Sequence, residues 1–271
     1  MRVAIAGASG RMGRTLIEAA LSSPDAQIVA ALDRPESPAF GSDCGTFLGR
    51  TTGVLVDAET SALNGADVLI DFTRPEATLE HVKACSTAGV NMVIGTTGFD
   101  DAGKRAIAAA SKDIAIVFAP NMGIGINTVF KLLDVAARIL DQSFDAEIVE
   151  LHHQHKVDAP SGTALKMGEI IARARGRELD KVAVYARQGN VGERKPGTIG
   201  FASLRGGDAI GDHTVLFAGI GERIEITHRA SNRMTYAIGS MRAARFLQGR
   251  RTGLYDMFDV LGLGPSSVSE R

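Results

Sequence analysis

Residues 2–13 read RVAIAGASGRMG, and this stretch decides the fold of the first half of the chain. Arg2–Ala6 is an apolar run of strand length, and the apolar spacing over Arg14–Leu21 predicts a helix. The glycines between them let the backbone come close to a pyrophosphate, which the N-terminus of the helix attracts. The stretch therefore indicates a dinucleotide-binding domain; the alternative is a tight turn that only packs the helix on the sheet.

Strand, turn and helix alternate from this stretch as far as Asn121. Continuous apolar runs such as Val68–Phe72 are typical of a parallel sheet that helices cover on both faces. The alternation predicts a Rossmann-like, doubly wound α/β domain.

The pattern changes after Asn121, where a helix over Asn127–Leu140 leads into a series of strands. One helix, near Thr163–Arg175, interrupts the series. We expect an α+β domain with an open mixed sheet in this part of the chain. The expected strands are Asp145–Leu151, Val182–Arg187, Thr198–Leu204, Thr214–Gly219 and Glu222–Arg229.

A last helix over Met234–Leu247 is expected to return to the first domain. The predicted dinucleotide-binding domain therefore comprises residues 1–122 and 234–271. Residues 123–233 are predicted to form a domain for substrate binding and oligomerisation.

The composition excludes several classes of partner. The chain of 271 residues has a formal net charge of −1 and no block of like charge, which argues against nucleic acid and anionic membranes. No apolar run approaches the ~20 residues that span a bilayer, and we see no signal peptide. Cys44 and Cys85 lack metal-ligand spacing and are expected to be reduced thiols. These features predict a cytoplasmic protein.

Asp33 and Arg34 give opposite indications about the coenzyme. Asp33 follows Gly13 by 20 residues, where an acidic group normally binds the ribose 2′-hydroxyl of NADH. Arg34 is placed to hold the 2′-phosphate of NADPH with help from Arg11, unless it is only a solvated loop cation. We therefore expect both NADH and NADPH to be used.

Two further turns are candidates for the nicotinamide half of the coenzyme. Gly95–Thr97 and Ala119–Asn121 each follow a predicted strand, where open α/β sheets bind ligands. Threonine and asparagine side chains can hydrogen-bond a carboxamide, although ordinary turn chemistry would also explain them.

Residues 150–164 read ELHHQHKVDAPSGTA and hold three of the six histidines of the chain. Side chains alternate along a strand, so neighbouring histidines share a pocket only if the strand ends near Leu151 and they lie on a loop. Ser161–Thr163 precedes a predicted helix and forms a candidate anion cradle for a carboxylate, which is compatible with helix capping. Asp158 either orients a histidine or pairs with Lys156.

The same segment is a weak candidate for a metal. Three histidines in four positions lack the spacing of a common zinc site, and no cysteine completes the set. The ammonium group of Lys156 would also repel a dication. We therefore expect no metal.

These motifs closely resemble those of the dihydrodipicolinate reductase family (4-hydroxy-tetrahydrodipicolinate reductases) of lysine and diaminopimelate biosynthesis. The resemblance covers nearly the whole chain. It implies an NAD(P)H-binding first domain, and a central domain that binds a cyclic dicarboxylate and forms a homotetramer. The matching stretches are Gly7–Gly13, Asp71–Glu76, Gly95–Gly98, Ala119–Asn121, Glu150–Ala164 and Thr227–Thr235.

The resemblance also implies roles for single residues. His152 falls on the family's proton donor/acceptor, and Lys156 on its proton donor. The residues that fall on substrate contacts are His153, Gly162, Thr163 and Arg233. The predicted coenzyme contacts are Gly7, Ala8, Ser9, Gly10, Arg11, Met12, Asp33, Arg34, Gly95, Thr96, Thr97, Ala119, Pro120, Asn121 and Met122.

The sequence departs from the family pattern at three positions. Gln154 stands where many relatives carry a basic residue, Met122 where an aromatic is common, and Asp33 where glutamate is frequent. Two alternative functions stay open. One is another two-domain NAD(P) dehydrogenase, and the other is a non-catalytic NADPH-sensing regulator. We expect the two domains of a reductase to close on each other, because the hydride donor and the acid segment belong to different domains.

Overall fold

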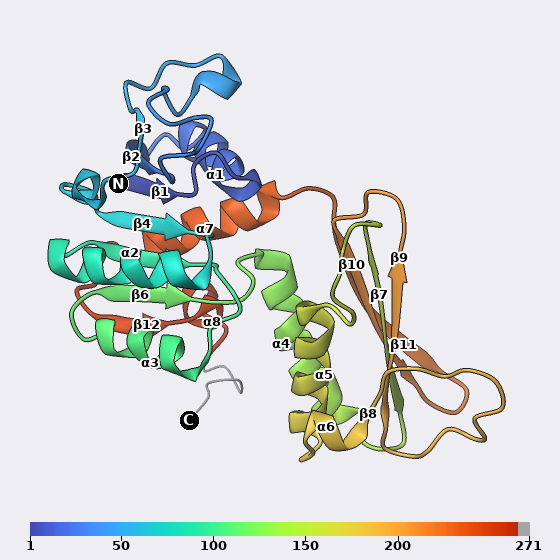
Figure 1. Ribbon diagram of the computed structural model, residues 1–271. Helices are drawn as coiled ribbons and strands as arrows, with labels where there is room; N and C mark the ends of the chain where they lie inside the picture. The colour runs from blue at the N-terminus through green and yellow to red at the C-terminus, as the bar shows by residue number, and fades with distance from the viewer. Residues whose placement is uncertain (265–271) are drawn as a thin grey trace. The chain divides into compact units, whose positions relative to one another are not determined.

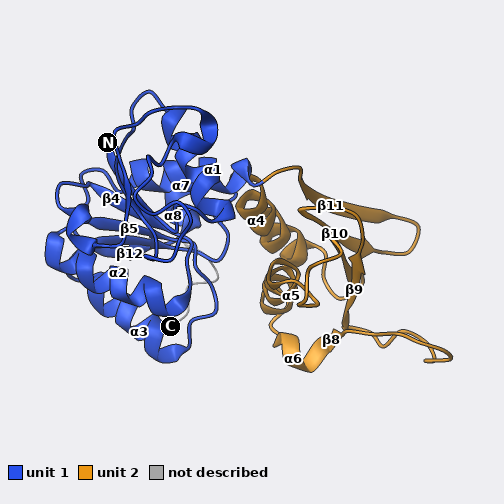
Figure 2. Ribbon diagram, turned by 45° about the horizontal axis from the view of Figure 1, so that its top comes forward, with its two compact units in different colours: residues 1–124, 233–264 blue, residues 125–232, 265–271 orange. Residues whose placement is uncertain are grey.

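The computed structural model describes residues 1–264 of the chain. Its Cα positions divide into two compact units, shown in blue and orange in Figure 2. Unit 1 comprises Met1–Ile124 and Arg233–Gly264, and unit 2 comprises Gly125–Asn232. The chain therefore leaves unit 1 once and returns to it.

A seven-stranded parallel sheet forms the centre of the described part of unit 1. Its strand order is β12-β6-β5-β4-β1-β2-β3. The chain runs from β1 to one side of the sheet and then crosses to β4 on the other side, so the two strands flank a topological switch point. The strands are β1 (Arg2–Ala6), β2 (Gln27–Leu32), β3 (Val56–Asp57), β4 (Val68–Asp71), β5 (Asn91–Ile94), β6 (Ala115–Phe118) and β12 (Gly253–Tyr255).

Helices cover both faces of this sheet (Figure 1). Side chains of β1 alternate between two separate cores: Val3 and Ile5 face one, and Ala4 and Ala6 face the other. Helices α1 and α7 pack together on the first side, and α2 and α3 on the second. The predicted doubly wound α/β domain is therefore confirmed. The helices are α1 (Arg11–Leu21), α2 (Pro75–Ala88), α3 (Asp101–Ala110), α7 (Met234–Phe246) and α8 (Met257–Leu261), with 3-10 turns at Thr46–Leu48 and Thr60–Leu63.

A five-stranded mixed sheet forms the centre of the described part of unit 2. Its strand order is β11-β10-β7-β9-β8. Strand β10 is antiparallel to both neighbours, whereas β9 is parallel to β7 and β8. Helices α4 and α5 lie on one face of this sheet (Figure 1), which confirms the predicted open mixed sheet. The elements are α4 (Ile124–Ile139), β7 (Asp145–His152), α5 (Gly162–Ala174), α6 (Leu179–Val182), β8 (Ala183–Val184), β9 (Ile199–Arg205), β10 (Gly211–Ala218) and β11 (Arg223–Ala230).

The expected strand over Val182–Arg187 is wrong. Helix α6 occupies the start of this segment and only Ala183–Val184 pairs in the sheet. The chain then leaves the ladder, and Arg187 donates hydrogen bonds of 2.7 and 2.8 Å to the carboxylate of Glu147. No helix among residues 1–264 is long and apolar enough to cross a bilayer.

A buried carboxylate ties three elements of unit 1 together at the end of β4. Asp71 is fully buried and accepts hydrogen bonds from the backbone N–H and hydroxyl of Thr73, at 2.8 and 2.7 Å. Nδ1 of His81, on α2, lies 2.7 Å from its other oxygen. Thr96, in the turn after β5, lies 3.4 Å away. The carboxylate therefore fixes the turns that follow β4 and β5.

Replacing this carboxylate should destabilise unit 1 and change its response to acid. Burial alone would raise the pKa of Asp71, but hydrogen bonds led by that from His81 lower it below 3.8. The stabilisation is therefore complete above the unfolded-state pKa and is lost as pH falls through the lower folded-state value. Asp71→Asn should lower the free energy of unfolding at neutral pH by about 3 kcal/mol, and flatten the acid decline. Urea unfolding across an acid pH series measures both.

The matched control is Asp113→Asn, which removes an exposed carboxylate of the same unit. It should leave the unfolding curve close to that of the wild type. Equal stability of both variants at every pH would contradict the role of Asp71.

Candidate active site

The segments predicted to bind the coenzyme meet at one edge of unit 1. All strands of its sheet run in the same direction, so the turns after them lie together. The glycine turn follows β1 and Asp33 follows β2, while Gly95–Thr97 follows β5 and Ala119–Met122 follows β6. The structure therefore brings these four segments to the edge where ligands of such sheets bind.

The glycine turn fits an anion. Gly7 has a φ of 67°, and a Cβ on Gly13 would lie 2.0 Å from the carbonyl oxygen of Gly7. No side chain caps α1 at Gly10, and the first turn of the helix holds no acidic residue. The first backbone N–H groups of α1 therefore have no side-chain partner and are open to an anion; a pyrophosphate there stays a prediction.

Asp33 stabilises the glycine turn. Its carboxylate accepts hydrogen bonds from the backbone N–H groups of Ser9, at 2.8 Å, and Arg34, at 2.9 Å. The guanidinium groups of Arg34 and Arg11 are exposed, and no partner for either is described. The carboxylate and the two cations thus adjoin the same turn. The geometry is therefore compatible with both NADH and NADPH.

In the turns predicted to meet the nicotinamide, two of the expected contacts have their side chains turned inward. The hydroxyl of Thr96 accepts a hydrogen bond of 2.9 Å from Thr78 and is almost fully buried. The side chain of Met122 is completely buried in the core that also holds Ala237 and Met241. Thr97 is exposed. Only the backbone of Thr96 and Met122 therefore borders this edge.

In unit 2, β7 ends one residue past the expected end near Leu151, so His152 still belongs to the strand and not to the loop that holds His153 and His155. His152 is the last residue of the strand, pairs in register with Arg205 of β9, and is only 8% exposed. The ladder continues because His152 lies on the buried, helix-facing side, like Ile148. The loop begins at His153, whose N–H donates to the carbonyl of Ala209 at 2.8 Å.

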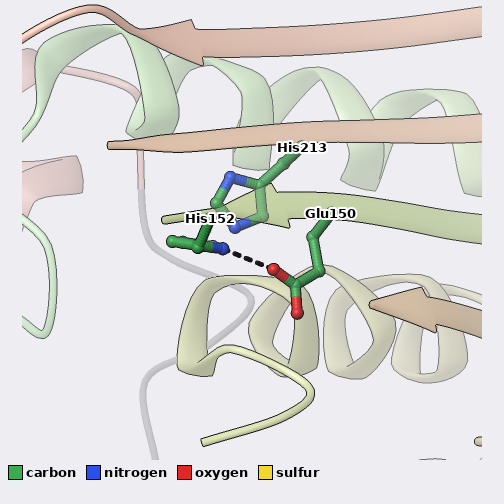
Figure 3. Close-up of side chains that lie close together, drawn as sticks. All are labelled: Glu150, His152 and His213. Carbon is green, nitrogen blue, oxygen red and sulfur yellow. Dashed lines mark hydrogen bonds and ion pairs between the residues drawn. The ribbon is translucent and has the colours of Figure 1, made fainter. Parts of the chain in front are cut away.

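Glu150 lies beside His152 on this buried face (Figure 3). Its Oε2 accepts a hydrogen bond from Nδ1 of His152. Arg205 donates to both carboxylate oxygens, each at 2.9 Å, and the N–H of Ser161 lies 3.3 Å from Oε1. A carboxylate, an imidazole and a guanidinium are therefore joined in one network.

His213 of β10 completes the cluster. Its ring centre lies 5.0 Å from that of His152, edge to face, and its Nε2 lies 3.0 Å from the hydroxyl of Ser161. Burial lowers the pKa of His213 to about 3, so this imidazole is neutral. Sequence reasoning missed His213 and Arg205, because their neighbours carry no motif and only the register of the sheet brings them to this site.

Three possible metal ligands meet in this cluster. Atoms of Glu150, His152 and His213 lie within 4.8 Å of one another. Both oxygens of Glu150 are already engaged by the cationic Arg205, which would repel a dication. The chemistry of the donor set therefore favours a hydrogen-bonded network over a metal centre.

The surroundings of Glu150 and His152 set the charge of each side chain. Burial alone would raise the pKa of Glu150, but hydrogen bonds, the strongest from Arg205, lower it below its ordinary value. Burial lowers the pKa of His152, and the attraction of Glu150 offsets only part of this. At neutral pH the carboxylate is therefore ionised and the imidazole neutral. Its proton is on Nδ1, because a carboxylate can only accept.

The loop after β7 carries the other candidate residues. Asp158 pairs with Lys156, with Nζ at 2.6 and 2.8 Å from its two oxygens, which decides between the two roles expected for it. Arg205 also donates to the carbonyl of Asp158 at 2.6 Å. Nδ1 of His153 is buried, and no described residue bonds to it. The loop thus offers one ammonium group and one buried nitrogen that lacks a partner.

Helix α5 begins at the anion cradle predicted from the sequence. The hydroxyl of Ser161 caps it by accepting from the N–H of Ala164 at 3.2 Å. Gly162 is exposed, and a Cβ there would meet nothing within 4 Å. No partner is described for the N–H groups of Gly162 and Thr163, so this helix end can bind a carboxylate. Arg233 belongs to unit 1, at the N-cap of α7.

Both cysteines are buried free thiols. Burial raises the pKa of Cys44, and it raises that of Cys85 to about 12. Neither is therefore a thiolate at neutral pH, which argues against a dehydrogenase that forms a thioester intermediate.

Comparison with known proteins assigns the family. The family model for the dihydrodipicolinate reductase N-terminus matches residues 1–122, and that for its C-terminus matches residues 125–261. The 4-hydroxy-tetrahydrodipicolinate reductase of Cupriavidus pinatubonensis is 62% identical over 97% of this chain and 100% of its own. That of Chromobacterium violaceum is 61% identical over 96% of this chain and 98% of its own.

Solved structures agree with this assignment. A dipicolinate-bound dihydrodipicolinate reductase from Paenisporosarcina sp. TG-14 superposes with a TM-score of 0.75 at 27% identity, covering 96% of this chain and 98% of its own. A myo-inositol 2-dehydrogenase from Lactobacillus plantarum, at 12% identity and a TM-score of 0.59 over 96% of this chain and 93% of its own, shares only the fold. With both family models matched and the relatives covered over their full lengths, the chain belongs to the dihydrodipicolinate reductase family.

Proposed function

We propose that the chain reduces 4-hydroxy-tetrahydrodipicolinate, by way of dihydrodipicolinate, to tetrahydrodipicolinate with NAD(P)H in lysine and diaminopimelate biosynthesis. The observation that carries the proposal is the His152–Glu150 pair, which adjoins the Lys156 loop and the open N-terminus of α5. Its relatives are named for this reaction, and a solved relative holds dipicolinate, a cyclic dicarboxylate.

The proposed reaction needs an acid beside an electron-rich ring. A reduced coenzyme bound by the turns at the carboxyl edge of unit 1 would supply a hydride to the conjugated imine. The ring then carries negative charge, which nearby cations stabilise until a proton is delivered. We assign delivery of this one proton to Lys156, through Nζ. His152 exchanges protons through Nε2, which carries none in the neutral ring, so it donates there only after it has taken one up. Hydride transfer would require the coenzyme bound by unit 1 and the substrate bound by unit 2 to come together.

Two substrate carboxylates need several hydrogen-bond donors. We propose that the free N–H groups of Gly162 and Thr163 bind one of them, with His153 supplying a further donor. Lys156 adds positive charge, and Arg233 of unit 1 is the further carboxylate ligand. Exchange of Asp158 for a substrate carboxylate would keep the Lys156 ammonium paired throughout binding.

The rival function with a specific feature in its favour is an NADPH sensor, because the uncapped start of α1 at the glycine turn needs no residue of unit 2 to attract a pyrophosphate. A sensor would not need the buried, ionised carboxylate of Glu150 that binds His152. It would bind NADPH without consuming it when the cyclic substrate is present.

Lys156→Ala tests the proposed acid. The variant removes the ammonium group next to the substrate, so kcat should fall by at least about 100-fold while NADPH binding stays near wild type. Steady-state kinetics and coenzyme titration measure the two effects. Lys181→Ala, which removes an exposed lysine paired with Glu178, is the control and should keep full activity. Full activity of Lys156→Ala would refute the role.

We further propose that both NADPH and NADH serve as coenzyme, because Asp33 and Arg34 adjoin the same turn. Arg34→Ala should lower kcat/KM for NADPH about tenfold, since a hydrogen bond to a charged group is lost, and change that for NADH little. Initial rates with each coenzyme give the ratio. Arg105→Ala, on the exposed surface of α3, should leave both values unchanged. An equal loss with both coenzymes would contradict a 2′-phosphate contact.

We propose a homotetramer formed through the face of the unit 2 sheet that α4 and α5 leave uncovered. Side chains alternate along the strands. Ile148, Phe201 and Val215 point toward the helices, so the residues next to them in the sequence point to the uncovered face. Its apolar members are half-exposed or exposed, as expected for a surface covered by another copy. They are Val149, Leu151, Leu204 and Leu216.

Leu216→Asp should break this assembly, because it puts a charge into an apolar interface. Sedimentation equilibrium of the wild type should give the mass of four 28.5 kDa chains, and that of the variant a smaller mass. Leu55→Asp, at an exposed position of unit 1, should stay tetrameric. A wild type that sediments as a single chain would overturn the proposal.

A further inference from the structure

We infer that Arg205 and Glu150 are positioning residues for both proton-transferring side chains, with Arg205 linking the His152 strand end to the Lys156 loop. This inference rests on the proposed function and deepens it. Neither Arg205 nor Glu150 needs to touch the substrate for the role.

The first link is between Glu150 and His152. Both lie on the helix-facing side of β7, two residues apart, and Oε2 of Glu150 accepts from Nδ1 of His152. This bond fixes the tautomer and the ring plane, and leaves Nε2 as the nitrogen that can exchange a proton with the substrate. A Cβ on Gly211 would lie 3.0 Å from Nε2, so a larger residue there would crowd that nitrogen.

The second link is the guanidinium of Arg205. It grips both oxygens of Glu150 at 2.9 Å, which holds the carboxylate in the plane that His152 requires. Its Nη2 also donates to the carbonyl of Asp158 at 2.6 Å. Asp158 in turn holds Nζ of Lys156 at 2.6 Å. One planar group therefore sets the positions of the imidazole and the ammonium relative to each other.

The third step concerns charge. The groups that face His152 are Glu150 on its own strand, Arg205 on β9, the neutral His213 on β10, and Lys156 on the loop. Only Glu150 among them favours the imidazolium, because the cations oppose it. Removing its charge should therefore lower the pKa of His152 and shorten the pH range in which the ring is a proton donor.

The test replaces the carboxylate with an amide of the same shape. Glu150→Gln should lower kcat by at least about tenfold, with a change in KM below about threefold. The pH above which kcat declines should move to lower values. Glu178→Gln is the control, since it removes an exposed carboxylate of the same unit that pairs with Lys181. It should keep the kcat and pH profile of the wild type.

Arg205→Lys separates positioning from charge. Lysine keeps the positive charge but cannot hold both oxygens of Glu150 and the Asp158 carbonyl at once. Its kcat should fall at least about fivefold while the KM for NADPH is unchanged. A kcat and pH profile equal to those of the wild type in Arg205→Lys and Glu150→Gln would overturn the inference.

A measurement on the wild type covers the case in which both variants fail to fold. Nitrogen-15 NMR of the histidine side chains, assigned with His152→Gln, should show His152 protonated at Nδ1 at neutral pH. The Nε2-protonated tautomer would overturn the inference. Absence of substrate-dependent turnover in the wild type would instead refute the proposed function, so the two failures are distinguishable.

Discussion

The ion pair between Glu150 and Arg205 is the interaction on which the proposed chemistry of unit 2 depends. The carboxylate is buried on β7, and it stays ionised because Arg205 of β9 donates to both of its oxygens. An uncompensated charge at this position would cost several kcal/mol, so the two strands and their register are coupled to the ion pair. The same carboxylate orients His152, and the same guanidinium reaches the Lys156 loop.

Unit 1 uses a buried carboxylate in a comparable way. Asp71 closes β4 and holds Thr73, His81 and Thr96, so the turns at the coenzyme edge are fixed from beneath. Asp33 does the same for the glycine turn by accepting from the N–H of Ser9. In both units, therefore, an acidic side chain fixes the backbone or side chains that are predicted to meet the ligand.

The fold was largely predictable from the sequence, because apolar runs and glycine turns are local signals. The glycine turn, the alternation up to Asn121 and the mixed second sheet were all confirmed. The short β8 and the extension of β7 through His152 were not predicted, since both depend on pairing with β9. The positions of Arg205 and His213 could not be predicted, because only the register of β9 and β10 against β7 brings them to Glu150. The predicted ligand contacts stay predictions.

The reductase function is tested most directly by the oxidation of NADPH and NADH by the wild-type protein, which is measured as a loss of the absorbance of the reduced coenzyme. The substrate is made in situ by a coupled synthase from pyruvate and aspartate semialdehyde. A reductase should lower the absorbance with both coenzymes only when this substrate is formed. No loss with either coenzyme, in protein shown to bind NADPH, would contradict the reductase function and favour a sensor.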